Sequence, residues 1–104
     1  MIPKNTIKRI KSLAQKKQRR KQNLFVAEGD KNVLDALGSS LEVIELIATP
    51  DYIQENNTLS EKARILRPAE HAEIKKVSFL KTPQNSLAVC TIPSPPDFPK
   101  KLRE

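Results

Sequence analysis

The feature that most constrains the fold is an alternation of short apolar runs with helix patterns between Leu24 and Ile92. The apolar runs are rich in β-branched residues and predict strands at residues 24–28, 42–49, 63–66 and 87–92. The segments between them predict helices at residues 30–38, 51–54 and 69–77, with Pro50 and Pro68 at first-turn positions. Strands that alternate with helices indicate an α/β fold with right-handed crossovers. We therefore expect a small three-layer α/β/α domain with a mostly parallel four-stranded sheet.

Both ends of the chain differ from this central region. In residues 1–22, Ile7, Ile10 and Leu13 recur at helical spacing and predict a basic helix that runs on towards residue 20, with Asn5 or Thr6 as its cap. Past Ala14 this helix has no apolar face. Residues 93–104 hold four of the eight prolines, a density that excludes regular structure. We expect residues 1–92 to form one domain, and residues 93–104 to form a linker to a domain that is absent from this chain.

Positive charge is concentrated at the N-terminus. Residues 1–22 carry nine Lys and Arg residues and no Asp or Glu, whereas residues 23–104 carry ten basic and twelve acidic residues. A block of one sign is typical of a surface that binds a polyanion. We favour nucleic acid as that polyanion. A solvated helix end is a second interpretation, and a membrane-lying helix is a third, although it would need bulky apolar anchors that this segment lacks.

Nothing in the sequence predicts catalytic or metal chemistry. His71 is the only histidine, so no paired-histidine metal motif exists, and Cys90 lies in the apolar run LAVCTI, as a buried inert thiol would. The two glycines do not form a phosphate-binding loop. We assign no catalytic residue and no metal ligand. The single cysteine, the lack of a signal core and the lack of a membrane-spanning run favour a cytoplasmic protein.

Two blocks of the sequence resemble signatures of SpoU-type (TrmH-like) RNA 2′-O-ribose methyltransferases. The first is KKQRRKQNLFVAEGDKNVLDAL, residues 16–37, and the second is TPQNSLAV, residues 82–89. Asn23 and Asn85 stand where glycine is common in the family, and we expect Asn85 to accept a positive φ. The residues that match the two signatures are Arg19, Phe25, Glu28, Gly29, Val33, Ala36, Leu37, Thr82, Pro83, Gln84, Ala88 and Val89.

The resemblance implies an N-terminal substrate-binding domain with a fold similar to kink-turn-binding ribosomal proteins. Such a domain presents tRNA or rRNA to a trefoil-knotted catalytic domain, which is usually homodimeric and binds S-adenosylmethionine. The motifs of that catalytic domain are absent from this chain, so the resemblance implies that this chain alone is not an enzyme. A stand-alone ribosomal-protein-like RNA-binding module is the alternative. A protein-interaction domain with an acidic partner is a third possibility.

The candidate site residues fall into two groups. A direct contact with phosphates is expected from basic side chains, because Phe25 alone provides no platform for stacking bases. Glu28 and Gly29 are expected at a strand-to-helix turn, with Glu28 near the helix N-terminus or paired with Arg19. The RNA-binding candidates are Lys8, Lys11, Lys16, Lys17, Arg19, Arg20 and Lys21. The structural-motif candidates are Phe25, Glu28, Gly29, Pro83 and Gln84.

Overall fold

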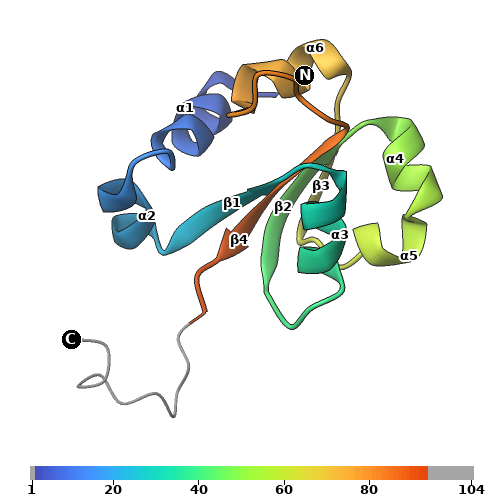
Figure 1. Ribbon diagram of the computed structural model, residues 1–104, viewed down its shortest axis with the longest axis horizontal. Coiled ribbons are helices and arrows are strands. Elements are labelled where there is room, and N and C mark those ends of the chain that lie inside the picture. Colours follow the sequence, from blue (N-terminus) through green and yellow to red (C-terminus); the bar gives the residue numbers. More distant parts are fainter. Residues whose placement is uncertain (1, 94–104) are drawn as a thin grey trace.

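Four strands form a single mixed sheet at the centre of the computed structural model, which describes residues 2–93. The strand order is β1-β4-β2-β3 (Figure 1). These strands are β1 (Leu24–Glu28), β2 (Val43–Ala48), β3 (Ile65–Pro68) and β4 (Ser86–Thr91). All four predicted strands are confirmed, with small shifts in their bounds. The α/β class and the four-stranded sheet are likewise confirmed.

The prediction of a mostly parallel sheet is wrong. Only β2 and β3 pair in parallel among the described strands, while β4 runs antiparallel to both β1 and β2. The cause is the path of residues 78–85, which bring the chain back to the end of the sheet at which β2 and β3 finish. There Ala48 of β2 pairs with both Ser86 and Pro68. Strand β4 therefore starts where its neighbours finish, and it enters the sheet between β1 and β2.

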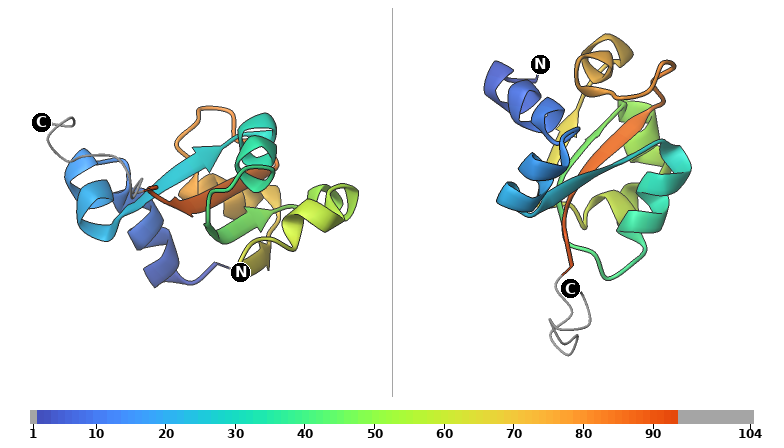
Figure 2. Two further views of the ribbon diagram at one scale, coloured as in Figure 1. Left: turned by 90° about the horizontal axis from the view of Figure 1, so that it is seen from below. Right: turned by 60° about the vertical axis from the view of Figure 1, so that its left-hand side comes forward.

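Helices cover both faces of the sheet (Figures 1 and 2). On one face lie α1 (Lys4–Ser12) and α6 (His71–Val77). On the other face lies α3 (Asp30–Leu37), with α4 (Pro50–Glu55) and the short α5 (Asn57–Ser60) beside it. The three predicted helices of the central region correspond to α3, α4 and α6, whereas α5 was not predicted. Pro68 ends β3, and α6 begins three residues later.

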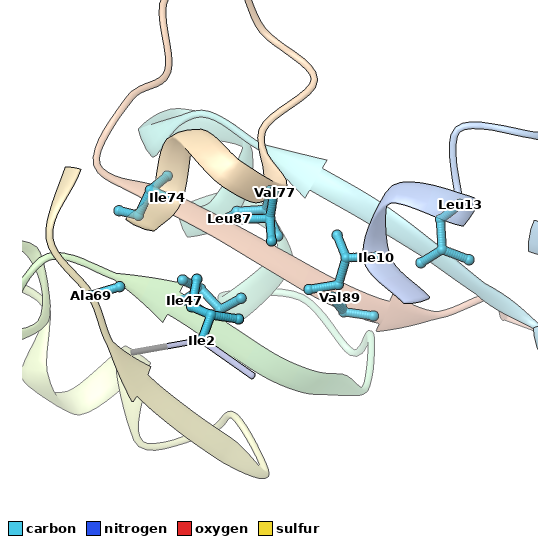
Figure 3. Packing of buried hydrophobic residues seen from close by; sticks show 9 residues of the cluster. All are labelled: Ile2, Ile10, Leu13, Ile47, Ala69, Ile74, Val77, Leu87 and Val89. Atoms are coloured by element: carbon cyan, nitrogen blue, oxygen red, sulfur yellow. The ribbon is translucent and has the colours of Figure 1, made fainter. Parts of the chain in front are cut away.

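Each face of the sheet has its own apolar core, as the alternation of side chains along a strand requires. Figure 3 shows the first core, in which Ile47, Leu87 and Val89 of the sheet meet Ile10 of α1 and Ile74 of α6. The second core has Val43, Leu46, Ala48, Ala88 and Cys90 of the sheet against Val33, Ala36, Leu37 and Tyr52. Each core lies between the sheet and the helices on that face, so the described residues confirm the three-layer arrangement.

The basic segment forms two helices and not one. Helix α1 ends at Ser12, and α2 (Lys16–Gln22) begins after a turn in which Leu13 is buried. Pro3 occupies the N-cap position of α1, without a side-chain hydrogen bond, so the prediction of Asn5 or Thr6 as the cap is wrong. Asn23 then ends α2 in the left-handed conformation, with φ of 59°. This residue turns the chain directly from α2 into β1.

The predicted linker at residues 93–104 lies, apart from Pro93, outside the described residues, so that prediction stays untested. Among residues 2–93 the longest helix has nine residues, and none is long and apolar enough to cross a membrane.

Candidate nucleic-acid interface

Helix α2 presents an exposed cationic surface. It contains no buried residue, and no acidic side chain occurs in its first turn. Four of its side chains are exposed, those of Lys16, Lys17, Arg20 and Lys21. Within residues 2–93 none of the four forms an ion pair. We call these four residues the α2 cation cluster. Four unpaired charges on a helix of seven residues repel one another, so the cluster favours an anionic partner.

Other basic residues of the N-terminal segment have structural partners. The Arg9 guanidinium donates to Glu45 Oε1 at 3.0 Å, and Arg67 Nε donates to the other carboxylate oxygen at 2.5 Å. Glu45 is a buried acid with 1% exposure, so both arginines compensate its charge. Arg19 Nη1 donates to the main-chain oxygens of Leu13 and Ala14 at 2.8 and 3.0 Å. Arg19 thereby stabilises the turn between α1 and α2.

The two remaining RNA-binding candidates lie on α1. Lys8 is exposed. Lys11 Nζ donates to the Ser78 carbonyl at 2.9 Å, and it lies 4.7 Å from the centroid of the Phe79 ring. Lys11 therefore joins α1 to the chain that follows α6. Of the seven candidates, the structure leaves Lys8 and the α2 cation cluster exposed, and it gives Lys11 and Arg19 specific intramolecular contacts.

The two sequence blocks meet at the turn between β1 and α3. Gly29 has φ of 101°, and a Cβ at this position would lie 3.3 Å from Gln84 Oε1. The same Gln84 oxygen accepts a hydrogen bond of 2.7 Å from the Asp30 amide, at the start of α3. Gln84 thus supplies the N-terminal cap that Gly29, which has no side chain, cannot provide. The expected tight turn at Gly29 is confirmed.

Asp30 strengthens the contact between the blocks. Its Oδ1 accepts hydrogen bonds from the Asn85 amide at 3.0 Å and from Ser86 Oγ at 3.1 Å. Its Oδ2 accepts one from Asn85 Nδ2 at 2.8 Å. Asn85 does not have a positive φ, so that expectation is wrong; Asn23 has one instead. Asn85 acts through its side-chain amide, which glycine would lack, while Pro83 is half-buried in the same loop.

Glu28 does not pair with Arg19. Its carboxylate accepts hydrogen bonds from the Ser78 hydroxyl and, at 2.9 Å, from the Phe79 amide. It therefore holds the start of the loop between α6 and β4. Glu28 lies beside the N-cap of α3, as expected, but its carboxylate bonds to Ser78 and Phe79, so the expected pairing with Arg19 is wrong. Phe25 is half-buried and packs on the core beneath α3. No local pattern predicts the contact between Glu28 and Phe79, because it joins residues 51 positions apart.

One pocket of the described structure is unsuited to a polyanion. It has a volume of about 760 Å³ and is lined by α3, α4, the start of α6 and Asn85, which precedes β4. Four carboxylates line it, those of Asp30, Asp51, Glu55 and Glu70. His71 is exposed at this pocket, and its Nε2 lies 2.6 Å from Asn85 Oδ1. Figure 1 places α4 and α2 towards opposite ends of the sheet, so the acidic pocket and the α2 cation cluster are separate surfaces.

The prediction of an inert cysteine is confirmed. Cys90 is completely buried in β4, and burial raises the pKa of its thiol to about 11. A thiol with that pKa is almost entirely protonated at neutral pH, so it is a poor nucleophile. Among the described residues there is also no group of three or more His, Cys, Asp or Glu side chains that could hold a metal ion.

Comparison with known proteins identifies relatives. Residues 4–88 match the family of the MRM3-like substrate binding domain. The chain is 28% identical to an RNA methyltransferase assigned to the TrmH family from Porphyromonas gingivalis, with a TM-score of 0.77 over 93% of this chain. It is 22% identical to an AdoMet-bound rRNA methyltransferase from Sinorhizobium meliloti, with a TM-score of 0.70 over 92% of this chain.

A third similar structure is more distant in sequence. The SpoU methyltransferase AviRb from Streptomyces viridochromogenes is 14% identical, with a TM-score of 0.59 over 85% of this chain. The chain spans 38%, 36% and 35% of these three proteins in the order given. No curated protein matches the chain.

Two of these structures hold AdoMet, and we asked whether the described residues of this chain suit that group. The acidic pocket is open, and the Asp30 oxygens at its rim already accept three hydrogen bonds. Gly29 is packed against Gln84, and Gly38 follows the last turn of α3, so neither belongs to a loop that could cradle a cofactor. Neither the acidic pocket nor the two glycines therefore form a site suited to AdoMet.

Proposed function

This chain belongs to the MRM3-like substrate-binding domain family, the N-terminal part of TrmH/SpoU RNA methyltransferases, and from that membership we propose that it binds the RNA substrate of such an enzyme. The proposed enzyme transfers a methyl group from S-adenosylmethionine to a ribose 2′-oxygen of tRNA or rRNA. In this proposal the cofactor and the homodimer contacts belong to a catalytic domain outside this chain. In this proposal the domain supplies affinity and orientation, and no chemical step.

The observation that carries the proposal is the α2 cation cluster. Lys16, Lys17, Arg20 and Lys21 are exposed together on one helix, without an acidic partner among the described residues. Lys8 of α1 adds a further exposed charge. Lysine and arginine side chains that neutralise phosphates release counterions, so binding weakens steeply as salt rises. Contacts of this kind position an RNA without reading its bases.

The test compares two triple variants with the same change in net charge. One carries Lys16→Ala, Lys17→Ala and Lys21→Ala, and the other carries Lys31→Ala, Lys62→Ala and Lys75→Ala, three exposed lysines elsewhere in the fold. Both are titrated with a structured rRNA or tRNA fragment at several salt concentrations. The α2 variant should lower the slope of log K against log salt by about 2–3, because each lost phosphate contact removes roughly 0.7–0.9.

The control variant should keep most of the slope of the unchanged chain. Equal losses in the two variants would mean that net charge alone attracts the RNA, and this would contradict a specific role for α2. Arg19 is left unchanged in both variants, because its substitution would also release the carbonyl groups of Leu13 and Ala14.

A further inference from the structure

A second, less polar hollow lies beside the α2 cation cluster. It has a volume of about 460 Å³ and is lined by Leu13, Ala14, Arg19, Phe25, Val26 and Phe79. Cavities of roughly 300–1,000 Å³ with apolar and aromatic walls and a few polar groups are typical of small-ligand sites. The one charged lining residue is the cation Arg19. The hollow therefore suits a flat ligand whose apolar face contacts these walls and whose own negative charge lies near Arg19.

Phe79 is an exposed aromatic residue with a fixed position. Its side chain is 39% exposed, although aromatic residues are commonly buried. Its amide donates to Glu28 Oε1 at 2.9 Å, and Lys11 Nζ lies 4.7 Å from the ring centroid. Glu28 is a positioning residue in this arrangement. A ring that is held before binding loses less conformational entropy when a ligand stacks on it.

Arg19 is fixed in the same way on another wall. Its two hydrogen bonds to Leu13 and Ala14 hold the guanidinium at the boundary between the hollow and α2. Aromatic rings and guanidinium planes are the groups on which proteins stack unpaired bases. Two members of the α2 cation cluster lie close to Arg19 in the sequence, Arg20 directly after it and Lys17 two residues before it.

We propose that this hollow binds one unpaired nucleobase of the RNA, stacked on Phe79 beside Arg19, while the α2 cation cluster contacts the neighbouring phosphates. The inference rests on the proposed function and adds a preference for an unpaired nucleotide to it. It also revises the expectation that Phe25 alone provides no stacking platform, because the fold brings Phe79 to the same hollow as Phe25.

The experiment uses three hairpin RNAs of one sequence. One has a single-nucleotide bulge, the second has an abasic ribose at the bulged position, and the third has no bulge. The 104-residue chain should bind the first more tightly than the other two by roughly five- to 150-fold, the effect of about 1–3 kcal/mol of stacking per base. Fluorescence of 2-aminopurine at the bulge should also be quenched on binding.

Phe79→Ala is compared with Leu80→Ala. The two residues are adjacent and similarly exposed, at 39% and 42%, but only Phe79 lines the hollow. Phe79→Ala should abolish the preference for the bulged base and leave the salt slope unchanged, because the α2 cation cluster is intact. Leu80→Ala should keep the preference, and Phe79→Tyr, which retains a stacking ring, should keep it as well.

The outcomes separate this inference from the proposed function. If the unchanged chain binds all three hairpins equally and with the expected salt dependence, the inference is overturned and the proposed function stands. If it binds none of them at low salt, both are overturned. A Phe79→Ala protein that still prefers the bulged base also overturns the inference.

Discussion

At the scale of single residues, the sequence blocks are explained by backbone conformations and by caps. Gly29 has φ of 101°, a region that L-residues rarely adopt, and its missing Cβ leaves room for Gln84 Oε1. Asn23 has φ of 59°, which asparagine tolerates better than most residues. Asn23 therefore has a conformational role at the end of α2, whereas Asn85 contributes hydrogen bonds.

Gly29→Ala should lower the free energy of unfolding by about 1–3 kcal/mol. The new Cβ would be strained at φ of 101° and would lie 3.3 Å from Gln84 Oε1, which caps α3. Urea denaturation followed by circular dichroism measures the change. Gly38→Ala is the control for the conformation, because a Cβ there would lie equally close, at 3.3 Å, to the Leu34 carbonyl oxygen, but its φ of −83° suits alanine. Its effect should stay under about 1 kcal/mol. Equal losses at both glycines would contradict the assigned role of Gly29.

At the scale of helices and strands, local patterns predicted most of what the structure contains. The β-branched runs at β2 and β4 and the spacing of Val33 and Leu37 in α3 are signals that neighbouring residues carry by themselves. The break between α1 and α2 was missed, because burial of Leu13 and the bonds from Arg19 override the good helix propensity of this segment. The direction of β4 was missed because it depends on the path of the loop before it.

Helix α1 is joined to the sheet by a buried charge that no local pattern reveals. Arg9→Ala would leave Glu45 with Arg67 as its remaining partner, so unfolding free energy should fall by about 1–3 kcal/mol. Lys8→Ala, one residue away and exposed, should change it by less than about 0.5 kcal/mol. Urea denaturation of both variants measures this. A larger loss for Lys8→Ala than for Arg9→Ala would contradict the role of Arg9 in docking α1.

At the scale of the whole molecule, one end of the sheet organises the fold. Strands β1 and β2 end there and β4 begins there, so the turn after Glu28 and the loop before Ser86 meet. Glu28 binds the start of that loop and Asp30 binds its end. The candidate site could be predicted only in part for this reason. The cations of α2 are consecutive in the sequence, whereas Phe79 reaches the hollow through contacts between distant segments.

The contact between Asp30 and Asn85 should contribute a coupling free energy to unfolding that can be measured. Asp30 accepts two hydrogen bonds from Asn85, at 3.0 and 2.8 Å, and these join residues 55 positions apart. Asn85→Ala keeps the main-chain amide, so a double-mutant cycle of Asp30→Ala and Asn85→Ala measures the bond from Asn85 Nδ2 alone. The loss in the double variant should be smaller than the summed single losses by about 0.5–1.5 kcal/mol. Each variant is measured by urea denaturation.

The control cycle uses Asp35→Ala in place of Asp30→Ala. Asp35 is an exposed carboxylate on the same helix and does not bond to Asn85 in the described structure. Asp35→Ala and Asn85→Ala should be additive within about 0.5 kcal/mol. Because Asp30 lies in the first turn of α3, its loss also removes a favourable interaction with the helix dipole, but the cycle cancels that term. A coupling near zero between Asp30 and Asn85 would contradict a contribution of the Asn85 side chain to the contact between the two sequence blocks.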